Sequence, residues 1–297
     1  MAVLRWIGLG VCVSAVATVV LTAMGSSRWA GRMGTLTRSL DTGRGVAVAK
    51  PPHPNDTTHY DARELEGLPA PVQRYFRAVL KEGQPMVSAV TIEMAGTINM
   101  SATAEQWKPF TSVQRVVTSA GSGSGFIWDA KIAMLPGITV RVVDSYIAGK
   151  GLLQAAMQGL FTVADISGGD EMARGEFMRF FAETPWYPTA LLPSQGVQWT
   201  AVNATSAKAT IVDGSIELTL LFHFNDAGLI DSVRAEARGG MVGKEMVMRP
   251  WECGLSNYQM RDGMTVPMSG EAAWVRPDGR KTYFMGSVKS IAYEYAG

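Results

Sequence analysis

The chain has 297 residues, of which 47% are hydrophobic and 18% charged, and its formal net charge is +1. This near-neutral balance lacks the basic stripe that marks nucleic-acid-binding domains, so we expect no nucleic-acid partner. The two cysteines, Cys12 and Cys253, are too few for a disulfide framework. A chain of this length can bury a sufficient apolar core without one.

The segment from Trp6 to Met24 contains no charged residue. A helix that crosses the hydrocarbon core of a bilayer needs roughly 20 such residues, so residues 1–25 are predicted to form a transmembrane anchor. A cleaved signal peptide is the alternative, although the run exceeds the usual length of a signal h-region. A single N-terminal anchor most often directs the export of the domain attached to it, and we expect the rest of the chain on the extracytoplasmic side.

Residues 26–64 are rich in Gly, Ser, Thr, Arg and Pro and have little apolar periodicity. This composition predicts a juxtamembrane linker, with a short helix near Arg28 to Leu40 as an option. The folded domain is expected over residues 65–297. Its first element is a predicted helix, because Val72, Tyr75, Phe76 and Val79 follow the i, i+3, i+4, i+7 spacing of a core-facing stripe.

From Val87 onward the apolar residues alternate with a period of two, which is typical of β-strands. Strands are predicted at 87–94, 112–118, 126–135, 138–147, 197–203, 207–212, 216–224, 229–237, 242–248, 254–260, 270–275 and 281–295. Turn sequences such as Asp213-Gly214 and Asp262-Gly263 separate them, and such short turns join antiparallel strands. The expected fold is α+β: a large, curved, half-barrel-like antiparallel sheet with a few short helices, preceded by one transmembrane helix.

One helix is predicted within this β-rich region, over Glu171 to Ala182. Helical spacing places Glu176, Arg179 and Glu183 on one face, where the guanidinium can pair with both carboxylates. Two interpretations stay open: a solvated row of ion pairs, or a polar row that faces a cavity. Trp186 and Tyr187 come next, between two prolines, which hold their rings in place and favour the cavity.

Asp129 and Asp144 are acids within apolar strands, where burial without a partner would be costly. Each is either an outward-facing strand residue or a charge at the rim of a ligand site. The full set of candidate ligand-binding residues is Asp129, Asp144, Tyr146, Glu176, Arg179, Glu183, Trp186 and Tyr187.

Catalytic and metal-binding motifs are not recognised in the sequence. The three histidines do not form a cluster with the cysteines, so no metal site and no cofactor are expected. Glu176 and Glu183 would lie about 10 Å apart along a helix axis, which does not suit the carboxylate pair of a retaining glycosidase. We therefore assign no catalytic residue.

Several segments resemble a bacterial family of unknown function. They are Phe126-Ile127-Trp128-Asp129-Ala130, Asp144-Ser145-Tyr146, Arg174-Gly175-Glu176, the run from Ala182 to Leu192, Pro250-Trp251-Glu252 and Gly270-Glu271-Ala272-Ala273-Trp274. The resemblance covers about Leu68 to Tyr295, and members of the family often carry an N-terminal hydrophobic span. The expected curved sheet is also similar, more loosely, to lipoprotein carriers of the LolA and LppX type.

The apolar composition suggests a function for the domain. Seventeen methionines, ten phenylalanines and eight tryptophans suit a deformable apolar cavity. We expect membrane-anchored, non-catalytic binding of an apolar or amphiphilic, lipid-like molecule in the cell envelope. The alternatives are a structural or interaction module of an envelope complex and a metal-independent hydrolase; no protein partner is identified.

Overall fold

The computed structural model describes residues 2–48, 58–101, 103–118, 123–242 and 245–296. Side chains are described from residue 20 to residue 43 of the first helix, and not for residues 241 and 242. The helices of the chain are α1 (Ala2–Val48), α2 (Ala70–Val79) and α3 (Asp170–Ala182). Short 3-10 turns lie at η1 (Ala62–Leu65), η2 (Thr184–Trp186), η3 (Pro188–Leu191) and η4 (Pro193–Gln195).

A single sheet of 13 strands makes up most of the described chain. Its first half consists of β1 (Val87–Asn99), β2 (Trp107–Val117), β3 (Gly125–Leu135), β4 (Ile138–Ile147), β5 (Lys150–Met157) and β6 (Phe161–Ser167). Its second half consists of β7 (Gln198–Asn203), β8 (Ser206–Asp213), β9 (Ile216–Phe224), β10 (Ile230–Val242), β11 (Glu245–Arg261), β12 (Met264–Arg276) and β13 (Gly279–Tyr295).

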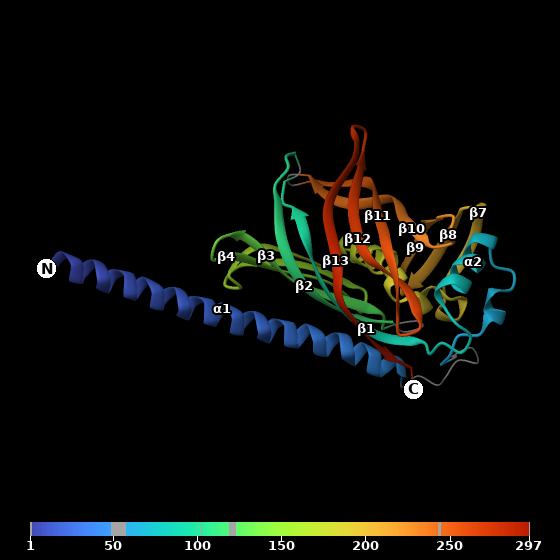
Figure 1. Cartoon of the computed structure of the whole chain (residues 1–297), viewed down its shortest axis with the longest axis horizontal. Coiled ribbons are helices and arrows are strands. Elements are labelled where there is room, and N and C mark those ends of the chain that lie inside the picture. Colours follow the sequence, from blue (N-terminus) through green and yellow to red (C-terminus); the bar gives the residue numbers. More distant parts are fainter. Residues whose placement is uncertain (1, 49–57, 102, 119–122, 243–244, 297) are drawn as a thin grey trace.

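Strands that follow each other in sequence pair in antiparallel fashion, except β6 and β7, which form the two edges, and the two halves join where β1 pairs with β13. The strand order is therefore β6-β5-β4-β3-β2-β1-β13-β12-β11-β10-β9-β8-β7. The sheet curls strongly, as wide twisted sheets do, so that its two arms curve round a common interior (Figure 1). The predicted half-barrel-like antiparallel sheet is thus confirmed.

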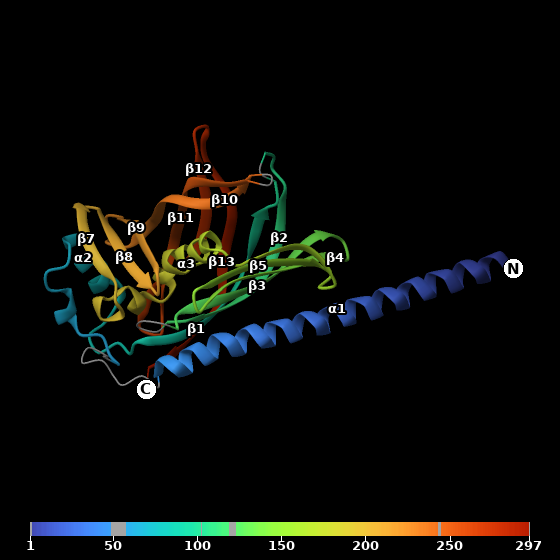
Figure 2. The ribbon, with the colours of Figure 1, turned by 180° about the vertical axis from the view of Figure 1, so that it is seen from behind.

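The segment between β6 and β7 fills this curve. Helix α3 contacts β3, β4 and β5 on one arm and β9 and β10 on the other. Figure 2 shows it between the two arms, seen from behind. The 3-10 turns after α3 carry the buried side chains of Trp186, Tyr187 and Leu191. The large core under α3 therefore ties the two arms of the curved sheet together.

The element boundaries differ from the prediction in a few places. Residues 150–157 and 161–167 form the hairpin β5–β6, in a region where no strand is predicted from the sequence. The strands predicted at 242–248 and 254–260 are one long strand, β11. The Pro250-Trp251 pair does not interrupt it, because Trp251 is buried and paired with Trp274 of β12.

The N-terminal region differs from the expected anchor and linker. Helix α1 runs from Ala2 to Val48 and crosses the predicted boundary at residue 25 without a break. Within the part of the chain that the structure describes, no helix is both long and apolar enough to cross a membrane. The predicted transmembrane segment is therefore not found there: residues 20–43 of α1 include Arg28, Arg32, Arg38 and Asp41, and the side chains of residues 6–19 lie outside the described ones.

The second half of α1 packs on the outer face of the sheet, opposite α3. Trp29 and Leu40 are buried against small and branched residues of five strands, namely Ala89, Val117, Ile127, Val143 and Ala156. The indole Nε1 of Trp29 donates to Asp129 Oδ1 at 2.9 Å, and Arg115 forms an ion pair with Asp41 at 3.0 Å. This half of α1 is a docked helix, which agrees with the option of a helix near Arg28 to Leu40 but extends beyond it.

Close backbone contact fixes the position of α1 at one point. A Cβ atom on Gly25 would overlap the carbonyl oxygen of Gln158 in the turn between β5 and β6. Gly159, with φ +73°, lies against the carbonyl of Gly25 from the other side. Only glycine lets the two backbones approach this closely.

We predict that Gly25→Ala displaces α1 from the sheet, whereas Gly31→Ala leaves it docked. A Cβ on Gly31 meets nothing within 4 Å, so this substitution should stabilise the helix, by up to about 1 kcal/mol. Hydrogen exchange of the amides between residues 20 and 43 measures the difference. Gly25→Ala should raise the exchange rates there and Gly31→Ala should not; equal rates would show that the contact at Gly25 does not hold the helix.

Candidate functional site

A cavity of about 100 Å³ lies inside the curved sheet, beside α3. Its wall is largely apolar and includes the rings of Trp128, Trp186, Trp251, Tyr283 and Phe284. Five charged side chains also line it: Asp144 of β4, Arg179 and Glu183 at the end of α3, Arg238 of β10 and Glu271 of β12. Glu271 pairs with Arg280 at 2.6 Å. This volume suits a small group or one end of a larger molecule.

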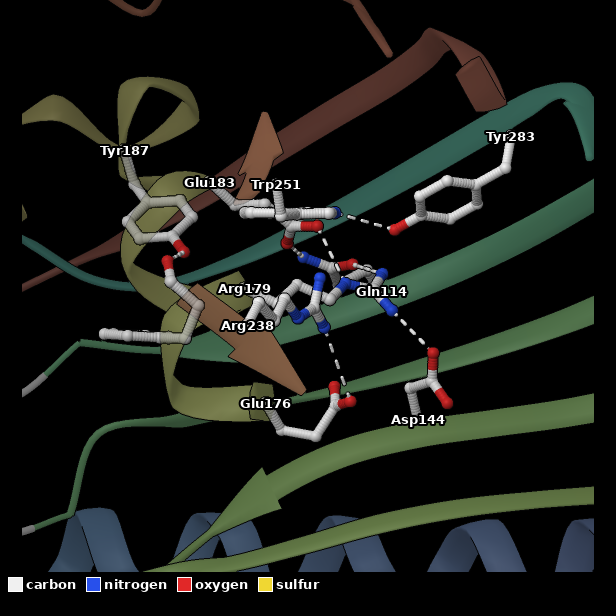
Figure 3. A network of polar contacts seen from close by, with 10 residues as sticks. Gln114, Asp144, Glu176, Arg179, Glu183, Tyr187, Arg238, Trp251 and Tyr283 are labelled. Atoms are coloured by element: carbon white, nitrogen blue, oxygen red, sulfur yellow. Dashed lines mark hydrogen bonds and ion pairs between the residues drawn. The ribbon is translucent and has the colours of Figure 1, made fainter. Parts of the chain in front are cut away.

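Arg179 is the centre of a buried polar network on one side of the cavity (Figure 3). Its guanidinium donates to Glu183 Oε1 at 2.9 Å, to Asp144 Oδ2 at 2.8 Å and to Gln114 Oε1 at 3.2 Å. The side chains of Arg179, Asp144 and Glu183 are 14%, 15% and 13% exposed. The polar row of α3 is therefore largely buried, which excludes the interpretation as a solvated face.

The local sequence explains how these groups meet. Arg179 and Glu183 are one helical turn apart, at i and i+4. Across the sheet, the register pairs Gln114 with Trp128 and Trp128 with Asp144, so the three side chains form one row over β2, β3 and β4. Side chains directly opposite each other in adjacent strands share a face. The row on the sheet therefore meets the row on the helix.

Aromatic rings support the same guanidinium. The centre of the Arg179 guanidinium lies 4.9 Å from the Trp128 ring and 5.0 Å from the Phe126 ring. Gln114 also donates to Glu183 Oε2 at 2.6 Å, which closes the network on itself. Burial lowers the pKa of Arg179, and the carboxylates of Glu183 and Asp144 more than offset this, so the guanidinium stays charged.

Arg238 forms the second charged group of the wall and is less well paired. Its guanidinium lies 4.3 Å from the Trp251 ring centre, and the Trp251 indole donates to the Tyr283 hydroxyl at 2.9 Å. The nearest carboxylate oxygen, Oε1 of Glu176, is 3.7 Å away, which is too long for a hydrogen bond. The planar donor group of Arg238 is thus held in place by stacking and has unused hydrogen-bonding capacity at the cavity.

Glu176 is buried between these two arginines. Burial raises its pKa, repulsion by Asp144 raises it further, and attraction by Arg238 and Arg179 offsets only part of the effect, so that its pKa is about 8. Its second oxygen, Oε2, is buried and makes no hydrogen bond. Glu176 is therefore mostly protonated at neutral pH. Burial raises the pKa of Asp144 as well, against the lowering effect of Arg179.

The structure places the remaining candidate residues at different points. Trp186 lines the cavity, donates to the carbonyl of Pro267 at 2.7 Å and packs on Gly270. Tyr146 stacks on Phe177 at 4.9 Å and donates to Asp213 Oδ2 at 2.6 Å. Tyr187 is fully buried and donates to the carbonyl of Phe180 at 2.8 Å. Both tyrosines contact α3, through Phe177 and Phe180, and neither is among the residues that line the cavity.

Asp129 is separated from the other candidates by the sheet. It follows Trp128 in β3, and successive residues of a strand point to opposite faces. Trp128 therefore faces the cavity, while Asp129 faces α1 and accepts the hydrogen bond from Trp29. Burial raises the pKa of Asp129, and the hydrogen bond from Trp29 lowers it in part.

Sequence reasoning missed Arg238, Gln114 and Tyr283. Arg238 carries no distinguishing local signal, because β10 also contains Asp231, Arg234 and Glu236. The strand predicted over 229–237 stopped one residue before it. Gln114 and Tyr283 carry no local signal, since they become site residues only through sheet pairing and the curvature of the sheet.

The arrangement is better suited to holding a molecule than to transforming one. Cys253 lines the cavity, but burial raises the pKa of its thiol well above the usual value, which disfavours the nucleophilic thiolate. The protonated carboxyl of Glu176 is not among the described residues that line the cavity. The cavity instead presents an apolar wall with two fixed guanidinium groups.

Comparison with known proteins gives a family but no activity. A family model described as "Family of unknown function (DUF6920)" matches residues 66–293, which confirms the resemblance seen in the sequence. No curated protein matches the chain.

Solved structures show distant similarity. A DUF1329 family protein from Desulfovibrio piger ATCC 29098 is similar with a TM-score of 0.39 and 10% identity, over 70% of this chain and 86% of that one. A β-barrel-like protein of DUF1849 from Brucella abortus is similar with a TM-score of 0.25 and 10% identity, over 70% of this chain and 99% of that one. A porin-like protein from Bacteroides uniformis ATCC 8492 is similar with a TM-score of 0.24 and 8% identity, over 71% of this chain and 96% of that one.

We predict that Arg179→Ala destabilises the fold by about 3–5 kcal/mol, because it strands Asp144 and Glu183 in a poorly hydrated interior. Urea unfolding measures this loss. Arg77→Ala is the matched control: Arg77 is exposed on α2 and donates to Gln73 at 3.0 Å, so its loss should cost less than about 0.5 kcal/mol. Equal midpoints for Arg179→Ala and the unsubstituted protein would contradict the buried network.

Glu176 predicts a specific pH dependence of stability. The pKa of Glu176 is about 8 in the folded state, and the ordinary pKa of a glutamate, taken for the unfolded state, is 4.5. Between pH 4.5 and about pH 8 the folded state therefore binds a proton that the unfolded state lacks. The free energy of unfolding should therefore fall as the pH rises through this window. Glu176→Gln, a neutral replacement, should flatten the fall, while Glu171→Gln at an exposed position of α3 should not. Urea titrations across the window test this, and an unchanged slope in Glu176→Gln would refute it.

Proposed function

The chain belongs to DUF6920, a family of unknown function, and from its cavity we propose that it binds an amphiphilic molecule without transforming it. The single observation that carries the proposal is Arg238. A guanidinium group with unused donors lies at a partly enclosed cavity with a largely apolar wall. Buried polar groups are nearly always hydrogen-bonded in folded proteins, so such a group is suited to a ligand that supplies the acceptor.

The charges around the cavity favour Arg238 over Arg179 as the contact for a head group. Arg179 already has three acceptors, on Glu183, Asp144 and Gln114. Arg238 has one carboxyl neighbour at 3.7 Å, and that neighbour, Glu176, is mostly protonated at neutral pH. The stacking on Trp251 fixes the plane of the Arg238 guanidinium and lowers the entropic cost of ordering it around a head group.

The apolar part of the wall suits the apolar part of such a ligand. Trp186, Leu255 and Phe284 lie beside the charged groups and offer a surface with few competing polar atoms. With about 100 Å³ of space, the cavity holds the head group and the adjoining carbons, and a longer tail extends from its mouth. The proposed ligand is therefore an amphiphile whose head group carries acceptor oxygens, such as a fatty acid.

We also propose that binding takes place at a membrane of the cell envelope, on its extracytoplasmic side. The uncharged run from Trp6 to Met24 supports this location. Membrane fractionation, followed by protease treatment of intact cells, tests both the attachment and the side.

A photoactivatable fatty acid with a diazirine on its chain tests the ligand proposal. After irradiation of the full-length protein, mass spectrometry should find the cross-links at residues that line the cavity, such as Trp186 and Leu255. Arg238→Gln should reduce the cross-linking at least about tenfold, because the loss of a charge-assisted hydrogen bond costs about 1.5–3 kcal/mol.

Arg234→Gln provides the matched control. Arg234 is on the same strand, forms an ion pair with Glu236 at 3.0 Å and does not line the cavity. Its replacement should leave the labelling unchanged. The methyl ester of the same probe should label the protein less than the free acid. Cross-links scattered over the surface, or equal labelling of Arg238→Gln and Arg234→Gln, would overturn the proposal.

A further inference from the structure

A second feature lies at one end of the sheet, where the tips of two hairpins lie beside α1. The β3–β4 tip carries Leu135 and Ile138, which are 62% and 37% exposed, and the β5–β6 tip carries Met157 and Phe161, which are 41% and 63% exposed. Single exposed apolar residues need no explanation, but a contiguous group does. We call these four residues the hairpin tips.

Hydrogen bonds hold the two tips together. The backbone N–H of Gln158 donates to the carbonyl of Thr139 at 2.8 Å, and its side-chain amide donates to the carbonyl of Gly137 at 2.7 Å. Thr139 Oγ1 returns a hydrogen bond to Gln158 Oε1 at 2.9 Å. The tips therefore form one rigid end of the sheet, with their exposed side chains in fixed positions.

Helix α1 extends this apolar end. Gly25 touches the turn at Gln158 and Leu160, and one turn earlier Val20, Leu21 and Met24 are 49%, 47% and 57% exposed. Figures 1 and 2 both show α1 continuing past the tips toward its N-terminus. At about 1.5 Å per residue, the uncharged helical run of residues 6–24 extends roughly 28 Å beyond this point.

The distribution of charge singles out the same end. Residues 132–140 and 151–164, which form the two tips and their flanks, contain no charged side chain. Cations border most of the uncharged stretches: Arg28 follows the helical run, and Lys131 and Arg141 flank the first tip. The second tip is flanked by Lys150 and Asp165. An uncharged apolar end with a mainly cationic border matches the hydrocarbon and anionic head groups of a bilayer.

We infer that the hairpin tips and the adjoining turn of α1 form a surface that contacts a lipid bilayer. Leu135, Phe161 and their neighbours lie at the interface of the bilayer, and the exposed residues Val20, Leu21 and Met24 of α1 contact it at the same place. This contact fixes the orientation of the sheet relative to the membrane. None of the four hairpin-tip residues is among those that line the cavity, so the inference is independent of the proposed ligand.

Site-specific fluorescence in liposomes tests this contact. The full-length chain with Cys12→Ser and Phe161→Cys carries an NBD label at residue 161; Cys253 is buried and stays unlabelled. The liposomes contain phosphatidylcholine, a minority of phosphatidylglycerol and a nitroxide-labelled lipid. The emission should shift to the blue and be quenched by the nitroxide. A label at Leu135→Cys should behave in the same way.

Val202→Cys is the matched control, because Val202 is 48% exposed on β7, the other edge strand of the sheet. Its label should show neither the shift nor the quenching. The inference is overturned if the labels at 161 and 202 respond alike. It is also overturned if the label at 161 shifts without lipid quenching and in proportion to protein density, which would identify a second copy of the chain as the occupant.

Discussion

The structure depends on the burial of charged residues of α3 inside a curved sheet. Arg179 can lie there because the sheet presents Asp144 and Gln114, and because the helix itself presents Glu183 one turn later. Removing two charges from water is costly, and only close geometry with additional hydrogen bonds repays the cost. The network therefore specifies how the helix sits on β2, β3 and β4, down to the register of these strands.

The same helix also reaches the other arm of the sheet, through Glu176 and its neighbour Arg238 on β10. The two halves of the chain are joined directly at β1 and β13 and a second time across α3. A wide open sheet would otherwise leave its concave face to solvent. The insertion between β6 and β7 covers that face, and the cavity remains where rings and guanidinium groups meet without filling the space between them.

Two parts of the sheet thus have separate roles in our proposals. The concave face, with α3, holds the cavity, and the end of the sheet beside α1 holds the hairpin tips. Trp128 and Asp129 illustrate the division, because adjacent residues of one strand serve the cavity and the docked helix. A ligand that enters the cavity would do so at a fixed distance from a bilayer that contacts the tips, which suits a molecule exchanged with a membrane.

The sequence by itself determined the strand-rich antiparallel fold, the helices at α2 and α3, the family and the pairing of Arg179 with Glu183. These features arise from periodicities of two and 3.6 residues, from turn residues and from motifs, all of which are local. Only the tertiary structure decided which charges meet. Asp144 joined the site and Asp129 did not, although both are acids in apolar strands, because strand register and the side covered by α1 set the outcome. Arg238, Gln114 and Tyr283 became site residues for the same reason: the curvature of a 13-stranded sheet brings together residues more than a hundred positions apart, and no local pattern encodes that distance.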